Sequence, residues 1–193
     1  MGRKILVING HPDPSESRFC AALAKRYADA AAAAGHEVRT ISVGSLAFEM
    51  LRSKAAFEDA DPAAAIAGAQ DRILWAQHLV IIHPLWLGSA PALLKGFFEQ
   101  AFRYGFAMPR PGLDAPRGRL SGRSARLIVT MGMPAWIHRL VFGAFGVRAM
   151  ARGILRISGI APVRLSLIGQ VEGAADHRRR WLDRVADLGR LGA

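Results

Sequence analysis

Five short and nearly continuous apolar runs alternate along the chain with segments of helical pattern, and this alternation limits the possible folds more than any other feature. A strand that helices cover on both faces has no polar face, so it appears in a sequence as an unbroken apolar run. The predicted strands are residues 4–10, 37–43, 79–84, 126–131 and 163–168. The predicted helices are residues 16–34, 90–104 and 174–190, with interrupted helical segments over residues 44–76 and 134–158.

Strands that alternate with helices form a parallel sheet, because right-handed crossover connections place helices on both of its faces. The expected architecture is a three-layer α/β sandwich. The Rossmann strand order uses six strands and a glycine fingerprint after the first, whereas the flavodoxin-like order uses five strands. The turn after the first predicted strand contains no GxGxxG sequence. The sequence therefore predicts one flavodoxin-like domain over residues 1–193, with a five-stranded parallel sheet in the order 2-1-3-4-5.

Length and composition suit a single globular domain in a reducing compartment. The chain has 193 residues, of which 51% are hydrophobic, and a domain of this size buries roughly 70% of the surface of its unfolded chain. Cys20 is the only cysteine, which excludes an internal disulfide and a zinc site built from cysteines. No histidine pair has the spacing of a metal site, so no metal is predicted. The N-terminus has no signal-peptide pattern, and a cytoplasmic location is expected.

The net charge of +11 is concentrated in one part of the chain. Residues 103–164 contain eleven Arg, no Lys and one acidic residue, Asp114. Guanidinium groups bind phosphates and carboxylates in a planar, bidentate geometry, so this stretch favours anionic partners. A solvated basic surface explains the same charges equally well. Charge alone allows nucleic acid as a partner, but the stretch has no DNA-reading motif, so nucleic acid is not the expected one.

In a parallel sheet of this order, ligands bind beyond the carboxyl ends of the strands, between the first and third strands. The first loop that ends there, residues 10–19, leads into a helix. The free N–H groups and partial positive charge of a helix N-terminus form an anion site, to which His11, Ser17 and Arg18 can add donors. In an alternative interpretation, Ser15 or Ser17 merely caps the helix.

Two further loops are expected beside the first. The second loop, residues 84–96, contains Trp86, whose indole can lie against a flat heterocycle. A tryptophan that fills the core is the ordinary alternative. The N–H groups of residues 85–87 are expected to be free to meet heteroatoms of a ring. The third loop, residues 130–134, has Gly132 where a backbone can approach a ligand closely.

The sequences of these three loops resemble those of one family. GHPDP with SRF follows the first strand, PLWLGSAPALLKGFFEQAFRYGFA follows the third and VTMGMP follows the fourth. This combination is similar to the flavodoxin-like NAD(P)H:quinone oxidoreductases, which include the quinone reductases and the ancillary flavoproteins of potassium-efflux systems. The resemblance covers nearly the whole chain, and its middle motif is long and specific.

The resemblance implies a bound FMN, with FAD as the alternative, which NAD(P)H reduces and a quinone or similar acceptor reoxidises. It also implies a homodimer with sites at the subunit interface. In the phosphate region it places His11, Ser17, Arg18 and Phe19. Along the isoalloxazine ring it places Pro84, Leu85, Trp86 and Leu87, and at the opposite edge Thr130, Met131, Gly132 and Met133. In such an enzyme the cofactor carries the redox chemistry, and the protein supplies position and electrostatics.

The chain departs from the family pattern near the first and third loops. Cys20 stands where the best-known members have Asn, and the run Met131-Gly132-Met133 stands where they have Thr-Gly-Gly. Those members also place a Tyr and a His soon after the third loop to assist proton transfer. The nearest counterparts here are Trp136 and His138, which are the predicted catalytic residues.

Two functions of other classes also fit the sequence. A regulatory subunit could keep the fold and the flavin and act by docking on a membrane transporter, because one surface can serve either purpose. A basic nucleic-acid-binding module would use the Arg-rich stretch, and its affinity would fall steeply with salt. The main prediction is a flavin-dependent NAD(P)H oxidoreductase that reduces quinones or related electrophilic aromatics by two-electron hydride transfer in a ping-pong cycle.

Overall fold

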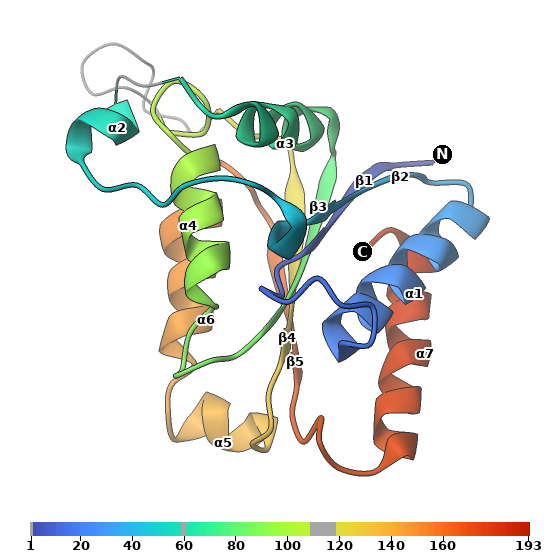
Figure 1. Ribbon diagram of the computed structural model, residues 1–193. Helices are drawn as coiled ribbons and strands as arrows, with labels where there is room; N and C mark the ends of the chain where they lie inside the picture. Colours follow the sequence, from blue (N-terminus) through green and yellow to red (C-terminus); the bar gives the residue numbers. More distant parts are fainter. Residues whose placement is uncertain (1, 59–60, 109–118) are drawn as a thin grey trace.

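A computed structural model describes residues 2–58, 61–108 and 119–193 and shows a five-stranded parallel sheet (Figure 1). The strand order is β2-β1-β3-β4-β5, as predicted, and all neighbouring strands are parallel. The strands are β1 (Lys4–Asn9), β2 (Glu37–Ser42), β3 (His78–Pro84), β4 (Ser124–Thr130) and β5 (Val163–Ile168). Every strand boundary lies within two residues of the predicted one.

Helices cover both faces of the sheet and complete the three-layer sandwich (Figure 1). One face carries α1 (Phe19–Ala33) and α7 (Ala175–Leu191), which pack against each other. The other face carries α3 (Ala64–Trp75), α4 (Ala92–Ala101) and α6 (Phe145–Ala149), which continues into the π-helix η2 (Met150–Arg156). The remaining short helices are η1 (Val43–Ser45), α2 (Lys54–Glu58) and α5 (Ala135–Leu140).

The central strand β3 divides the core between these two layers. Leu79 and Ile81 pack into the apolar cluster beneath α3 and α4, whereas Val80 and Ile82 pack into the cluster beneath α1 and α7. All four side chains are fully buried. This strand is covered on both faces, which is why its sequence is an unbroken apolar run.

Two helical segments differ from their predicted form. The helix predicted from residue 16 begins at Phe19, because the preceding residues are held in turns by hydrogen bonds such as that from the Arg18 N–H to the Ser15 carbonyl (3.1 Å). The segment 134–158 is divided into α5, α6 and η2, and the chain turns between α5 and α6 at Gly143 and Ala144, with φ of 62° and 50°.

Residues 109–118 of the Arg-rich stretch lie outside the described residues. In the part of the chain that is described, no helix combines the length and the apolar character needed to cross a membrane.

Candidate functional site at the carboxyl edge of the sheet

The three predicted loops lie together beyond the carboxyl ends of β1, β3 and β4. The first loop begins with Gly10, whose N–H donates to the carbonyl of Ile82 in β3 (2.7 Å). The rings of His11 and Trp86 meet edge to face with centroids 5.7 Å apart, so the first and second loops touch. The N–H of Leu85 donates to the carbonyl of Thr130 (2.7 Å), which joins the second loop to the third.

The first loop is held in shape by its own side chains. The Asn9 amide oxygen accepts a hydrogen bond from the His11 N–H (3.2 Å), and the Asp13 carboxylate accepts one from the Ser15 N–H (2.9 Å). Asp13 also forms an ion pair with Arg18 (2.6 Å). The Ser15 N–H and the Arg18 guanidinium together lower the pKa of Asp13, so this carboxyl group is ionised at neutral pH. The loop therefore has a fixed shape, and the charge of Arg18 is largely balanced by Asp13.

The beginning of α1 has unpaired donors. Arg18 is the N-cap residue, and no side chain caps the helix. The hydroxyls of Ser15 and Ser17 contact each other instead (2.8 Å), so neither serine has the capping role of the alternative interpretation. The Arg18 N–H donates to the Ser15 carbonyl, and the N–H groups of Phe19 and the next residue have no hydrogen-bond partner among the described residues. Free N–H groups at a helix start carry a partial positive charge, which suits an anion. Among the described residues, this helix start and the Ser17 hydroxyl are thus groups of the first loop that could donate to an anion, and whether they bind one stays a prediction.

The second loop exposes an aromatic and an aliphatic side chain. Trp86 and Ser89 exchange two backbone hydrogen bonds (2.9 and 3.0 Å) across a tight turn formed by Leu87 and Gly88, whose φ angles are 47° and 79°. Positive φ is strained for leucine, and such strain often occurs at ligand sites. Trp86 is 49% exposed and Leu87 is fully exposed, so Trp86 does not fill the core.

Backbone donors in the second loop differ from the prediction. The N–H groups of Leu85 and Trp86, which were expected to be free, donate to the carbonyls of Thr130 and Ser89. Within the described part of the chain, Leu87 alone of these three keeps an N–H without a hydrogen-bond partner. The expectation overlooked that the ends of a tight turn pair with each other. Pro84 is buried at the end of β3, and Leu85 is half-buried against the core.

The third loop has a buried beginning and an open end. Thr130 and Met131 are buried, and the Thr130 hydroxyl contacts the Cys20 thiol (Oγ1 to Sγ, 3.4 Å), whose pKa burial raises to about 11. Gly132 and Met133 are exposed, and the structure gives their N–H groups no hydrogen-bond partner among the described residues. A Cβ on Gly132 would meet only the Glu172 carboxylate, at 3.7 Å, so the fold itself does not require glycine here.

The two predicted catalytic residues lie on α5 in different surroundings. Trp136 is 63% exposed and lines a cavity on the side of α5 that faces β5. His138 is buried, and its Nε2 atom has no hydrogen-bond partner. Burial lowers its pKa, so the imidazole is neutral at pH 7. The role of both residues in proton transfer stays a prediction.

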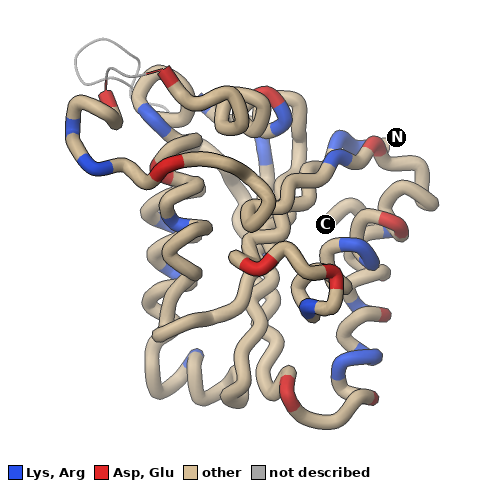
Figure 2. Tube along the Cα trace, viewed as in Figure 1, with Lys and Arg blue, Asp and Glu red and all other residues tan. Residues whose placement is uncertain are grey.

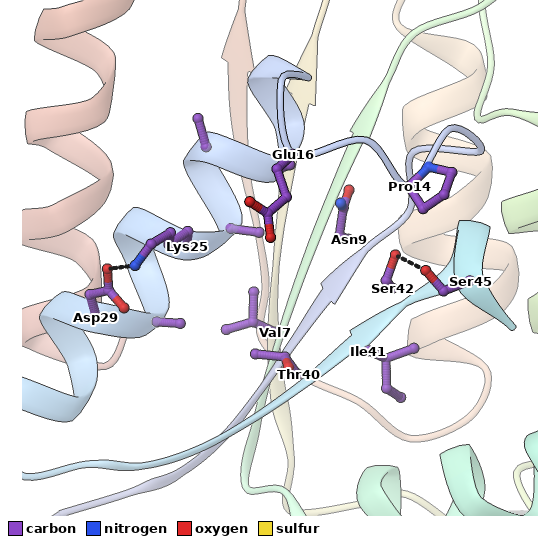
Figure 3. Close-up of a pocket in the computed structure, with 14 residues that line it drawn as sticks. Val7, Asn9, Pro14, Glu16, Lys25, Asp29, Thr40, Ile41, Ser42 and Ser45 are labelled. Carbon is purple, nitrogen blue, oxygen red and sulfur yellow. Dashed lines mark hydrogen bonds and ion pairs between the residues drawn. The ribbon is translucent and has the colours of Figure 1, made fainter.

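A cavity of about 620 Å³ opens beside the first loop, between α1 and the strands β1 and β2 (Figure 3). Asn9, Ser42 and the carboxylate of Glu16 give it a polar lining. Lys25 also lines it, but its ammonium is paired with Asp29 (2.6 Å). Carboxylates repel phosphate groups, so this cavity is a poor place for an anion. Sequence reasoning did not find this cavity, because its residues come from β1, the first loop, α1, β2 and η1.

No group of three or more His, Cys, Asp or Glu among the described residues could hold a metal ion.

The candidate site consists of a helix N-terminus, an exposed tight turn and an open glycine loop, at the edge of the sheet where the strand order reverses. A parallel sheet of this order with a site at this edge defines a flavodoxin-like protein. The sequence profile of the family described as "Flavodoxin-like fold" matches residues 3–190, and the chain belongs to that family.

Two curated proteins are similar to the chain in sequence. An uncharacterized NAD(P)H oxidoreductase of Haemophilus influenzae is 24% identical over 189 residues, which cover 94% of this chain and 91% of that protein. The ribosyldihydronicotinamide dehydrogenase-like protein traD of Penicillium crustosum is 36% identical over 70 residues. That match covers 33% of this chain and only 26% of traD, so the chain spans about a quarter of that protein.

Solved structures show the same fold. The protein Smu.1420 of Streptococcus mutans superposes with a TM-score of 0.77 and 26% identity, over 97% of this chain and 98% of that one. The NAD(P)H:quinone oxidoreductase of Methanothermobacter marburgensis superposes with a TM-score of 0.80 and 20% identity, over 100% and 98% of the two chains. An FMN-dependent NADH-azoreductase of Bacillus anthracis, solved with FMN, superposes with a TM-score of 0.74 and 14% identity, over 98% and 99%.

Proposed function

We propose that the protein is a flavin-dependent NAD(P)H oxidoreductase that binds FMN at the carboxyl edge of the sheet and reduces quinones or related electrophilic aromatics. The observation that carries the proposal is the exposed Trp86–Leu87 turn beside the uncapped start of α1. The Trp86–Leu87 turn offers an apolar surface to a planar ring, and the start of α1 offers N–H donors to a phosphate. Similar proteins named as NAD(P)H oxidoreductases and quinone oxidoreductases support the same class of reaction.

The residues present fit the phosphate of FMN. The phosphate would bind at the start of α1, with the N–H groups of Phe19 and the next residue, the Ser17 hydroxyl and the His11 ring as donors. Arg18 would contribute less than the sequence suggests, because Asp13 already holds its guanidinium. The carboxylates that line the cavity beside this loop disfavour a second phosphate, which supports FMN over FAD.

The residues present also fit a flavin ring. Trp86 and Leu87 offer an apolar face, and the unpaired N–H groups of Leu87, Gly132 and Met133 are donors for ring oxygen and nitrogen atoms. Pro84, Leu85, Thr130 and Met131 form the buried floor behind them. When bound, FMN supplies reversible two-electron hydride chemistry, which allows NAD(P)H and the acceptor to use one stacking position in turn.

The protein itself would position the flavin and the substrates, exclude water from them and supply hydrogen-bond donors. The apolar side chains would exclude water from the stacking position, and the fixed N–H donors would hold the ring edge by hydrogen bonds and stabilise negative charge there. His138, neutral and buried on α5, would hold a proton on its imidazole close to the third loop. Trp136 lies two positions before it and is exposed on another side of the helix. This assignment rests on the family resemblance and on the nearness of α5 to the third loop.

The proposed enzyme is a homodimer. Leu140, Val141, Phe142 and Phe145 are all more than half exposed and follow one another around the α5–α6 turn. A cluster of large exposed apolar side chains next to a ligand site is typical of a subunit interface.

An absorption spectrum of the purified protein tests the proposal. Protein expressed with ample riboflavin and incubated with FMN is expected to show a band near about 450 nm, which NADPH bleaches under nitrogen and a quinone restores. Protein that stays colourless after this treatment would refute the proposed function. A bound flavin that neither NADPH nor NADH bleaches would instead favour a purely regulatory flavoprotein.

A further inference from the structure

A second cavity, of about 540 Å³, lies between α5, α6 and the edge strand β5. Its lining combines three kinds of side chain: the exposed indole of Trp136, the guanidinium groups of Arg139 and Arg148, and the apolar side chains of Leu165 and Leu167. Trp136 and Arg139 are three residues apart on α5, so they lie on the same side of the helix. A volume of roughly 300–1,000 Å³ is usual for a small-molecule pocket.

The charge of this cavity is uncompensated. The structure shows no hydrogen bond or ion pair from Arg139 or Arg148 to any described residue. The chain contains no Asp or Glu between residues 119 and 171, and Figure 2 shows the segment of α5 without acidic residues. Two unpaired guanidiniums beside an exposed indole suit an aromatic ligand that carries several negative charges, because arginine pairs bidentately with phosphate and indole stacks on flat rings.

The cavity adjoins the end of the third loop. Ala135, which lines it, follows the third loop directly. α6 packs closely on the second loop, because a Cβ on Gly146 would collide with the Gly88 carbonyl and the Ser89 backbone. Gly146 faces the second loop, whereas Ala144 and Arg148, two positions to either side of it, face the cavity. A ligand seated in the cavity therefore has its inner end, at Ala135, next to the third loop, which is assigned to the isoalloxazine ring.

We infer that this cavity binds the phosphorylated adenosine end of the reduced nicotinamide dinucleotide and makes the protein prefer NADPH over NADH. The adenine would stack on Trp136, and Arg139 and Arg148 would bind the phosphates, including the 2′-phosphate that only NADPH carries. This inference rests on the proposed function, because it assigns a second part of the same substrate. The sequence of the Arg-rich stretch, residues 103–164, distinguishes no single arginine, whereas the cavity selects Arg139 and Arg148.

Calorimetric titration with adenosine 2′,5′-bisphosphate tests the cavity without any turnover. The protein is expected to bind this probe whether or not it has been loaded with FMN. Arg139→Gln and Arg148→Gln should each weaken binding by about tenfold or more, because each removes a charge-assisted hydrogen bond. Trp136→Ala should also weaken binding, and Trp136→Phe should restore most of it by keeping an aromatic face. Arg156→Ala removes an exposed arginine from η2 outside the cavity and should leave binding unchanged.

Steady-state kinetics give a second readout. In the two Gln variants the KM for NADPH is expected to rise about tenfold while the KM for NADH and FMN retention change little. The inference is overturned if adenosine 2′,5′-bisphosphate does not bind, if it binds the variants and the parent equally, or if both KM values rise together. Failure of the proposed function would give a different result. A protein that binds no flavin could still be titrated with adenosine 2′,5′-bisphosphate, so binding at this cavity is measured independently of flavin chemistry.

Discussion

Trp86 and Leu87 are the residues whose exposure is hardest to explain by folding alone. A large aromatic side chain at 49% exposure and a leucine in the left-handed region both cost stability, unless a ligand covers them. Trp86→Ala is therefore expected to lower FMN retention by tenfold or more, because it removes about 1–3 kcal/mol of stacking contact. Gel filtration followed by flavin fluorescence measures the retained fraction. Trp181→Ala on α7 is the matched control and should retain FMN as the parent does.

The buried imidazole of His138 allows a test of the acid–base assignment. His138→Ala is expected to leave FMN retention intact and to slow turnover, because it removes a neutral proton carrier and none of the residues assigned to FMN. The pH profile of kcat distinguishes the role, since loss of a titrating group should remove one limb of the profile. If the variant turns over as fast as the parent with the same profile, His138 serves packing alone.

His83 at the end of β3 makes stability depend on pH. It is 1% exposed, and its Nδ1–H donates to the Pro84 carbonyl (2.8 Å) while Nε2 has no partner. Burial lowers its pKa from 6.5 to about 4. Between these values the unfolded chain binds the proton and the folded chain does not, so stability falls as the pH drops below 6.5. This histidine alone should remove up to ~3 kcal/mol by pH 4.

Urea unfolding at several pH values measures this slope. His78, whose pKa burial lowers to about 3, acts in the same direction, so the parent should lose more than one histidine's share. His83→Gln is expected to make the decline between pH 6.5 and pH 4 shallower. An equal decline in the parent and the variant would contradict the assignment to His83.

At the scale of elements, the close packing of α6 on the second loop is the contact that places Trp86. The backbone of Gly88 and Ser89 occupies the space that a side chain at Gly146 would need. Gly146→Ala is therefore expected to displace the turn, to cost about 1–3 kcal/mol of stability and to weaken FMN binding. Gly153→Ala in η2 is the matched control, because nothing lies within 4 Å of the added Cβ, and it should be neutral or slightly stabilising. Thermal unfolding with and without FMN compares the two variants.

The elements also show what the sequence could predict. The strands and their order follow from apolar runs and from topology, and topology also brings the three loops together. Burial of His138 could not be predicted. It depends on the chain turning back at Gly143 and Ala144 so that the Ala144 N–H donates to the His138 carbonyl (3.0 Å), and alanine gives no sequence signal for positive φ. The cavity on α5 was equally hidden, because Arg148 and Leu165 approach Trp136 only in the folded chain.

At the scale of the whole molecule, charge and apolar surface gather at the same end. The helices α5 and α6 carry exposed apolar side chains and arginines without acidic neighbours, whereas the exposed acidic residues of the described chain belong to other elements, including the first loop, α1 and α7. This end also holds the candidate site. An apolar surface there is useful to a subunit interface, which would shield the stacking position from water on binding.

The homodimer is tested by placing a charge in the apolar cluster. The parent is expected to run as a dimer of a 20.8 kDa chain in size-exclusion chromatography with light scattering. Phe145→Asp should shift it toward monomer, because a carboxylate buried in an interface without a partner is strongly unfavourable. Leu191→Asp, at an exposed leucine near the end of α7, is the matched control and should remain dimeric. A monomeric parent, or a dimer that Phe145→Asp leaves intact, would show that this cluster is not the interface. If the stacking position is completed between subunits, the monomeric variant should also lose FMN at a lower protein concentration than the Leu191→Asp control.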